Sequence, residues 1–126
     1  MLVIDTGALV CWTLDPGRLS AAASAALDGS DGVRVSAISL WELGAGVRGG
    51  RVELPVSVRE YAGRLARVDG VAVLPVDEET WLKSLELEWD CEDVADRAIV
   101  ATAALRGCPL VTSDPRMRAF YPEAVW

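Results

Sequence analysis

The chain of 126 residues contains no histidine. This absence excludes Ser-His-Asp and Cys-His nucleophile systems, and it excludes every zinc site that uses imidazole ligands. If the protein is an enzyme, its chemistry must come from carboxylates, hydroxyl groups or cations.

Cysteine is also scarce, and long apolar runs are missing. Cys11, Cys91 and Cys108 are odd in number, widely spaced and never arranged as CxxC, which argues against a disulfide framework. The first residues, MLVIDTG, lack the basic region of a signal peptide, and no apolar run is long enough to cross a bilayer. We therefore expect reduced thiols, a cytoplasmic location and no membrane association.

Lysine is nearly absent, because Lys83 is the only lysine among 12 basic residues, and the net charge is −7. Residues 77–96 hold nine acids, whereas residues 34–67 hold six arginines against three acids. An acidic total argues mildly against nucleic-acid binding, since affinity for phosphates comes from Lys and Arg. A local arginine face, or an acidic pocket that holds a divalent metal, remains open.

Short apolar segments alternate with longer segments of helical character. With 52% hydrophobic residues, the chain predicts one ordered domain over residues 1–126. The alternation predicts an α/β fold, a three-layer α/β/α sandwich around a central, mostly parallel sheet of four or five strands. The strands are expected at residues 3–5, 33–39, 71–76, 109–114 and 124–126. The helices are expected at residues 6–14, 15–29, 39–47, 57–70, 77–89 and 93–106, with Ser39 and Ser57 opening capping boxes that end in Glu42 and Glu60.

The stretch LVIDTGALV contains the triplet Asp5-Thr6-Gly7, which resembles the active-site loop of retroviral-type aspartic proteases. Those proteases are short chains that dimerise to pair two aspartates, and strands follow their DTG. Here the triplet enters a segment rich in Ala and Leu, which favours a helix. The pattern therefore argues against the protease.

Four acids are expected at one edge of the sheet. Asp5 and Asp114 follow predicted strands, whereas Glu42 and Asp96 lie in the first turns of predicted helices. In open α/β sheets, functional sites lie beyond the carboxyl ends of the strands. Four such acids repel one another unless a cation lies among them, and a site of oxygen ligands suits Mg²⁺ or Mn²⁺.

Each acid also has a purely structural interpretation. Asp5 and Asp93 are suitable N-caps, and Glu42 completes a capping box. Asp96 can stabilise a helix dipole, and Asp114 before a proline is a common turn residue. The functional interpretation therefore rests on their shared edge and on no single residue.

Three blocks then carry a more specific resemblance: LVIDTGALV, VSAISLWELGAGVRGGRV and DVADRAIVATAALRGCPLVTSD. Together and in this order they resemble the signature blocks of PIN-domain proteins, in particular VapC-type toxins. The resemblance implies a magnesium-dependent ribonuclease with an α/β/α fold and a cognate antitoxin that inhibits it. The family's acids fall on Asp5, Glu42, Asp96 and Asp114.

The chain departs from the family pattern in three places. Gly7 stands where many members have a serine, Val94 replaces a proline, and a histidine sometimes found upstream is missing. None of these departures removes an acid, so we expect an active enzyme.

On this basis we expect RNA phosphodiesters to be hydrolysed by a metal-activated water. Asp5 and Asp96 are expected as direct ligands of Mg²⁺, with Mn²⁺ as an alternative ion. Glu42 and Asp114 are expected to bind it directly or through water.

Further side chains are expected to assist. Thr6, Thr112 and Ser113 could donate hydrogen bonds to the ligands or the phosphate, although local caps explain them equally well. Asp93 is also a candidate for supporting the ligands, although it is most simply the N-cap of its helix. The arginines Arg48 and Arg51 flank a glycine pair and are candidates for contact with the RNA backbone.

The apolar surplus and five tryptophans predict a homodimer with a further groove for an antitoxin peptide. A non-catalytic PIN-like module that binds RNA or protein remains the alternative, and it would have the acidic cleft without affinity for metal.

Overall fold

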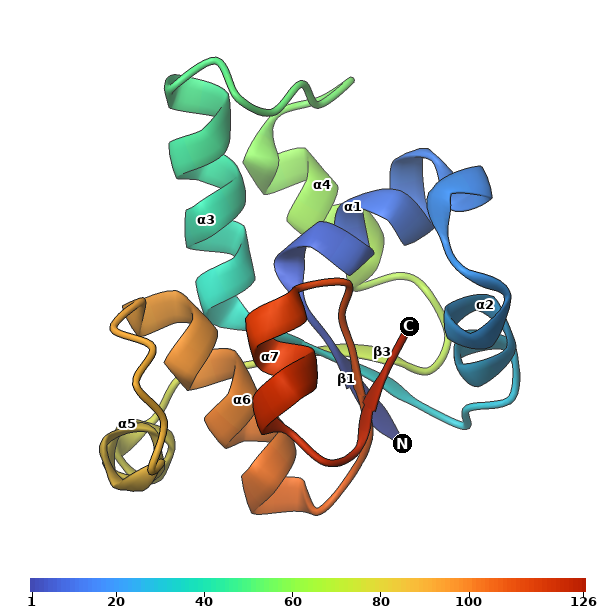
Figure 1. The fold of residues 1–126 in the computed structure, drawn as a ribbon. Helices are drawn as coiled ribbons and strands as arrows, with labels where there is room; N and C mark the ends of the chain where they lie inside the picture. The colour runs from blue at the N-terminus through green and yellow to red at the C-terminus, as the bar shows by residue number, and fades with distance from the viewer.

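A computed structural model describes residues 1–126 (Figure 1). It contains five strands, seven α-helices and one 3₁₀ turn. In chain order the elements are β1 (Leu2–Ile4), α1 (Thr6–Leu14), η1 (Pro16–Arg18), α2 (Ala21–Asp28), β2 (Val33–Ser36), α3 (Ala37–Arg48), α4 (Val58–Leu65), β3 (Val71–Leu74), α5 (Glu78–Glu86), α6 (Val94–Arg106), β4 (Leu110–Val111), α7 (Pro115–Phe120) and β5 (Ala124–Val125).

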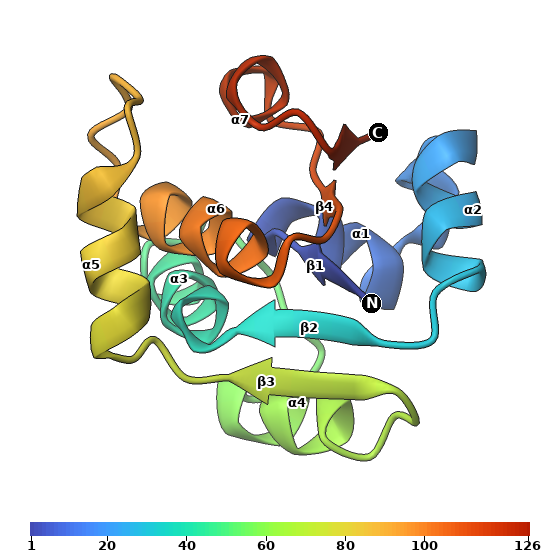
Figure 2. The ribbon, with the colours of Figure 1, turned by 90° about the horizontal axis from the view of Figure 1, so that it is seen from below.

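The strands form one sheet in the order β3-β2-β1-β4-β5, and every pair in it is parallel. Ile4 of the central strand lies opposite Val35 on one side and Val111 on the other. Figure 2 shows β2 and β3 side by side, with β1 and β4 following across the sheet. The expected α/β architecture is therefore confirmed, with five strands that are all parallel.

Both faces of the sheet are covered, as the alternation along β1 requires. Leu2 and Ile4 point into a core that also contains Leu9 of α1, Leu27 of α2 and Leu65 of α4. Val3, which lies between them, points to the opposite face, where α6 and α7 supply the core. Such two-sided burial explains why the strands are continuous apolar runs.

The helix expected over residues 6–14 is confirmed as α1, but the helix expected over residues 15–29 is divided into a 3₁₀ turn and α2. Asp15 leaves helical geometry with φ −151° and ψ 69°, Pro16 opens the 3₁₀ turn, and α2 starts anew after Ser20. The α region is sterically disfavoured for a residue that precedes proline, so α1 ends before Asp15. Ser20 then caps α2 by accepting from the Ala23 N–H at 3.0 Å.

The expected capping box at Ser39 is also wrong. Ser36 caps α3 by accepting from the Ile38 N–H at 3.3 Å, and Ser39 is a buried residue inside the helix. By contrast, Ser57 caps α4 as expected and accepts from the Glu60 N–H at 3.1 Å. That helix ends at Leu65 and does not reach Gly70.

The triplet Asp5-Thr6-Gly7 enters α1 directly, with Asp5 as its N-cap. This geometry contradicts the protease alternative, which requires strands after the triplet. None of the helices combines the length and the apolar character that a membrane crossing would require.

Candidate metal centre

The order of the strands places a topological switch point between β1 and β4. The chain moves from β1 to β2 and β3 on one side of the sheet, and then to β4 and β5 on the other. Asp5 directly follows β1, and Asp114 lies three residues beyond the end of β4. Crevices at such points, outside the carboxyl ends of the strands, are where open α/β sheets bind ligands.

Asp5 is held rigidly, with only 7% of its surface exposed. Its Oδ1 accepts from the Ala8 N–H at 2.7 Å, and its Oδ2 accepts from the Thr112 hydroxyl. Burial raises the pKa of Asp5 above its ordinary value, and the charge of Asp114 adds to this, whereas the hydrogen bonds from Thr112 and Ala8 act in the opposite direction.

Helix α3 packs against the start of α6 (Figure 1). Three further carboxylates meet there. Oxygen atoms of Glu42, Asp93 and Asp96 all lie within 4.8 Å of one another. Asp93 also caps α6 by accepting from the Asp96 N–H at 2.9 Å, which fixes the first turn of that helix. Asp93 was expected only to support the ligands, but its position makes it a candidate ligand in its own right.

Thr6 connects α1 with α3 at this centre. Its hydroxyl donates to Glu42 Oε1 at 2.5 Å and lies 2.8 Å from Ser39 Oγ. Burial raises the pKa of Glu42, the bond from Thr6 lowers it, and the charges of Asp93 and Asp5 raise it further.

The pKa of Asp96 is raised to about 7, first by burial and then by the charges of Asp93, Glu42 and Asp114. Arg116 opposes this increase. A carboxyl group with this pKa is charged only in part at neutral pH, because burial and the neighbouring negative charges both disfavour its ionised form. A divalent cation would relieve the repulsion.

Asp114 caps α7 by accepting from the N–H groups of Arg116 at 2.8 Å and Met117 at 3.4 Å. The side chain of Arg116 then turns back to the acids, with Nη2 2.9 Å from Asp96 Oδ2 and 3.6 Å from Asp114 Oδ2. No pattern in the sequence indicates this arginine in the centre, because the ion pair joins residues 20 positions apart.

Of the two other hydroxyl side chains expected beside the acids, that of Thr112 is hydrogen-bonded to them and that of Ser113 is not. Thr112 is fully buried; its hydroxyl donates to Asp5 and accepts from the Asp114 N–H at 3.0 Å, so it connects two of the acids. Ser113 is exposed and its side chain makes no hydrogen bond to the protein.

Gly7 has an ordinary helical backbone, and a Cβ added there would lie 3.8 Å from Asp5 Oδ1. The position therefore has room for a serine side chain.

Arg48 and Arg51 lie away from the acids. Arg48 is the last residue of α3, six positions after Glu42, which corresponds to about 9 Å along a helix axis. Arg51 donates to the Ala45 carbonyl at 3.3 Å. Both side chains are exposed, and neither forms an ion pair with the acids.

Arg97 is a second arginine that sequence reasoning missed. All five of its N–H donors are used, on the carbonyls of residues 84, 87, 89 and 91, at distances from 2.6 to 3.1 Å. These bonds hold the irregular segment that precedes Asp93 against α6. The Asp-Arg pair at positions 96 and 97 therefore combines a candidate ligand with the residue that fixes its surroundings.

The donor set fits a hard divalent cation. Every candidate ligand is a carboxylate, no thiol or imidazole is present in the cluster, and the charges repel without a cation. These are properties of Mg²⁺ and Mn²⁺ sites and not of structural zinc sites.

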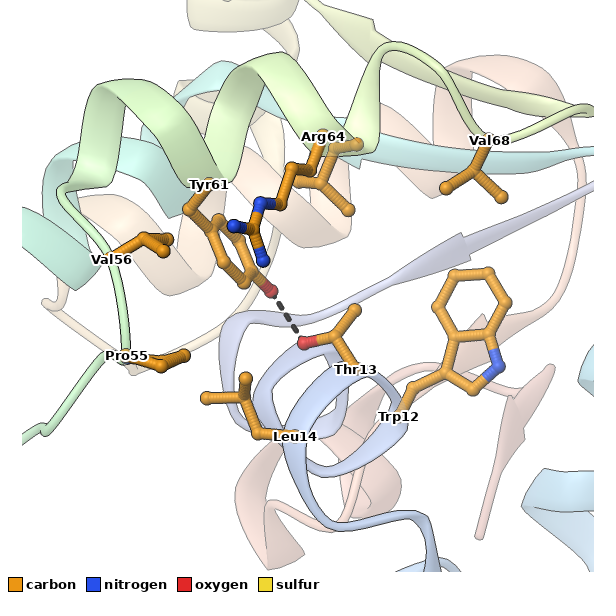
Figure 3. Close-up of a pocket in the computed structure, with 9 residues that line it drawn as sticks. Trp12, Thr13, Leu14, Pro55, Val56, Tyr61, Arg64 and Val68 are labelled. Carbon is orange, nitrogen blue, oxygen red and sulfur yellow. Dashed lines mark hydrogen bonds between the residues drawn. The ribbon is translucent and has the colours of Figure 1, made fainter.

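An apolar groove lies apart from the acids, between the end of α1, α4 and the loop before α4 (Figure 3). Its volume is about 340 Å³, and its lining includes Trp12, Leu14, Val56 and Val68. The Tyr61 hydroxyl is 2.7 Å from Thr13 Oγ1 and closes one wall, while Arg64 is a charged member of the lining (Figure 3).

Comparisons with known proteins identify the family of the chain and agree with its fold. The profile of the PIN domain matches residues 2–121. Ribonuclease VapC22 of Mycobacterium tuberculosis is 35% identical over 129 positions, which cover 99% of this chain and 98% of that protein.

Among solved structures, a toxin-antitoxin complex from Klebsiella pneumoniae superposes with a TM-score of 0.69 at 18% identity, covering 100% of this chain and 97% of the other. FitAcB from Neisseria gonorrhoeae gives a TM-score of 0.64 at 23% identity, covering 98% of this chain and 95% of the other. At these identities the structures support the fold, and the profile and the relative together establish the family. The chain belongs to the PIN domain family.

Proposed function

We propose that this protein, as one domain of residues 1–126, is a metal-dependent ribonuclease and the toxin of a VapBC-like toxin-antitoxin pair acting in the cytoplasm. The observation that carries the proposal is the convergence of carboxylates at the switch point of a PIN-domain fold. The name of the relative, Ribonuclease VapC22, supports RNA as the substrate.

In this proposal Asp5 and Asp96 bind the cation directly, and Glu42 and Asp114 bind it directly or through water. The oxygen atoms of Asp93 lie close enough to those of Glu42 and Asp96 to join the set. Mg²⁺ is the expected ion, with Mn²⁺ as the alternative, because both prefer carboxylate oxygen.

The cation would supply an activated water and neutralise negative charge on the scissile phosphate. The residues of the chain do the positioning. Thr112 and the Ala8 N–H fix Asp5, Thr6 orients Glu42, and the Asp93 cap fixes the first turn of α6. Since Asp5 and Glu42 each accept from a donor of the protein and the Asp93 cap fixes the turn that carries Asp96, much of the geometry is prepared before the substrate arrives.

Cleavage of labelled RNA with Mg²⁺ or Mn²⁺ tests the proposal. Asp5→Asn and Asp96→Asn keep the shape of the side chain but remove its charge, and each should lower the rate at least about a hundredfold. Excess chelator should abolish cleavage. Asp69→Asn is the matched control, because Asp69 is exposed and its side chain contacts none of the acids.

Activity that survives both substitutions or the chelator would refute the mechanism. Calorimetric titration with Mn²⁺ addresses the alternative, a non-catalytic module. If the protein binds no Mn²⁺ and cleaves no RNA, the non-catalytic alternative is favoured.

The antitoxin and dimer proposals rest on separate surfaces. The apolar groove with its charged Arg64 is a suitable site for an antitoxin segment that carries apolar and acidic side chains. A homodimer is supported by Trp41 and Val47 of α3, which are 71% and 40% exposed. Trp41→Ser should produce a monomer in sedimentation, whereas a dimer that persists would exclude this surface.

A further inference from the structure

Arg116 is the one cation that forms an ion pair with the candidate metal ligands. Its guanidinium reaches two of them, Asp96 at 2.9 Å and Asp114 at 3.6 Å. The side chain of Arg116 is 58% exposed, whereas those of Asp96 and Asp114 are 15% and 27% exposed. The arginine therefore covers the carboxylates from the solvent side, where a substrate would arrive.

The other arginines are not placed for this role. The donors of Arg97 are all used on backbone carbonyls, and Arg48 and Arg51 lie at or beyond the end of α3. Arg118 lies on the same short helix as Arg116, is exposed, and forms no ion pair with the acids.

A divalent cation and the guanidinium compete for the same oxygen atoms. A cation bound to Asp96 and Asp114 neutralises their charge and repels the positive guanidinium. Because Arg116 is exposed and joined to α7 by a flexible stem, it can leave at little cost. Its planar group of N–H donors fits a phosphate as well as it fits a carboxylate.

We propose that Arg116 exchanges partners during the reaction cycle: it neutralises Asp96 and Asp114 in the metal-free protein, and it binds the RNA phosphate once the metal has entered. The inference rests on the proposed function and adds a residue to it. Arg116 thereby opposes metal binding and favours substrate binding.

The first test measures Mn²⁺ affinity by calorimetry in the absence of RNA. Arg116→Gln should bind Mn²⁺ about five- to tenfold more tightly than the unmodified protein, because a competing charge is gone. Arg116→Lys should stay close to the unmodified protein, and Arg118→Gln is the matched control on the same helix. Weaker binding by Arg116→Gln would overturn the proposal, because it would mean that the arginine only orients Asp96.

The second test measures RNA binding without turnover. A fluorescein-labelled, single-stranded 12-nucleotide RNA of mixed sequence is titrated against protein carrying Asp5→Asn, at Mn²⁺ well above the dissociation constant measured for that variant. Adding Arg116→Gln should weaken binding and reduce the salt dependence by about 0.7, the value for one phosphate contact on a single strand. An unchanged salt dependence would overturn the proposal.

Failure of the inference is distinguishable from failure of the proposed function. If the unmodified protein binds Mn²⁺ and cleaves RNA but Arg116→Gln behaves like Arg118→Gln in both tests, only the role of Arg116 is refuted. If the unmodified protein binds no Mn²⁺, the proposed function fails first. Melting curves monitored by circular dichroism verify that each variant is folded.

Discussion

A single hydroxyl group, that of Thr6, connects the end of the central strand with the acid on α3. It donates to Glu42, whose pKa is already raised by burial and by neighbouring charge. If this donor is lost, the half-buried carboxylate of Glu42 still bears the free-energy cost of burial but no longer has the hydrogen bond that offsets it. Thr6 therefore affects both the stability of the protein and the charge available to a metal.

Thr6→Val removes this donor but keeps the shape of the side chain. We expect the free energy of unfolding to fall by about 1–3 kcal/mol, and the affinity for Mn²⁺ to fall because Glu42 loses the donor that orients its carboxylate. Urea denaturation and calorimetry measure the two effects. Thr6→Ser keeps the hydroxyl and serves as the control; equal losses in Val and Ser variants would contradict this role of the hydroxyl.

Asp96 makes the stability of the metal-free protein depend on pH. Its pKa in the fold is about 7, well above the ordinary value of 3.8, so the folded state binds its proton more tightly than the unfolded state. The resulting contribution is fully present below about pH 4 and is lost as the pH rises through about 7. The charges that face it are Asp93, Glu42 and Asp114, with Arg116 in opposition.

Urea denaturation from pH 4 to pH 8, in chelator, checks this prediction. The unmodified protein should lose stability across this range, and Asp96→Asn should show a flatter profile because the group that titrates is gone. Identical profiles would refute the raised pKa. With metal present the direction reverses, since binding requires the deprotonated carboxylate and affinity should increase up to about pH 7.

At the scale of elements, the start of α6 depends on the irregular segment before it. Arg97 binds the carbonyls of residues 84, 87, 89 and 91, and Trp89 stacks on Phe120 of α7 with ring centroids 4.9 Å apart. The segment is thereby fixed to α5, α6 and α7 together. Asp93 and Asp96 take their positions from this arrangement.

Arg97→Met should destabilise the protein by about 2–4 kcal/mol, because several carbonyls lose a charged donor. It should also weaken Mn²⁺ binding, since the first turn of α6 loses its support. Arg97→Lys keeps the charge but not the planar set of donors, so it should recover only part of both losses. Arg106→Met at the exposed end of the same helix is the control, measured in the same melting and calorimetry experiments.

The elements show where sequence reasoning succeeds and where it stops. Asp93 and Ser57 are caps that local chemistry alone identifies, and both cap their helices. Ser39 matched the same pattern, but β2 runs directly into α3, so the first available serine, Ser36, becomes the cap. The contacts of Arg116 and Arg97 depend on tertiary distances, which spacing along the chain does not encode.

At the scale of the whole molecule, the acids belong to helices that cover the two opposite faces of the sheet. Asp5 belongs to the start of α1, Glu42 to α3, Asp96 to α6 and Asp114 to the start of α7. Helices α1 and α6 cover opposite faces of the sheet. A cation held by these acids would therefore join both layers through the central switch point.

This arrangement predicts that metal stabilises the entire fold. At a Mn²⁺ concentration of 100 times the dissociation constant, binding to the folded state alone adds about 2.7 kcal/mol, which corresponds to roughly 10 °C in melting temperature for a domain of this size. Scanning calorimetry with Mn²⁺ and then with chelator measures the shift. Asp96→Asn should lose it, whereas Asp69→Asn should keep it. Tight binding with little change in melting would mean that the unfolded chain binds Mn²⁺ as well. It would contradict a site that exists only when α1, α3, α6 and α7 are brought together by the fold.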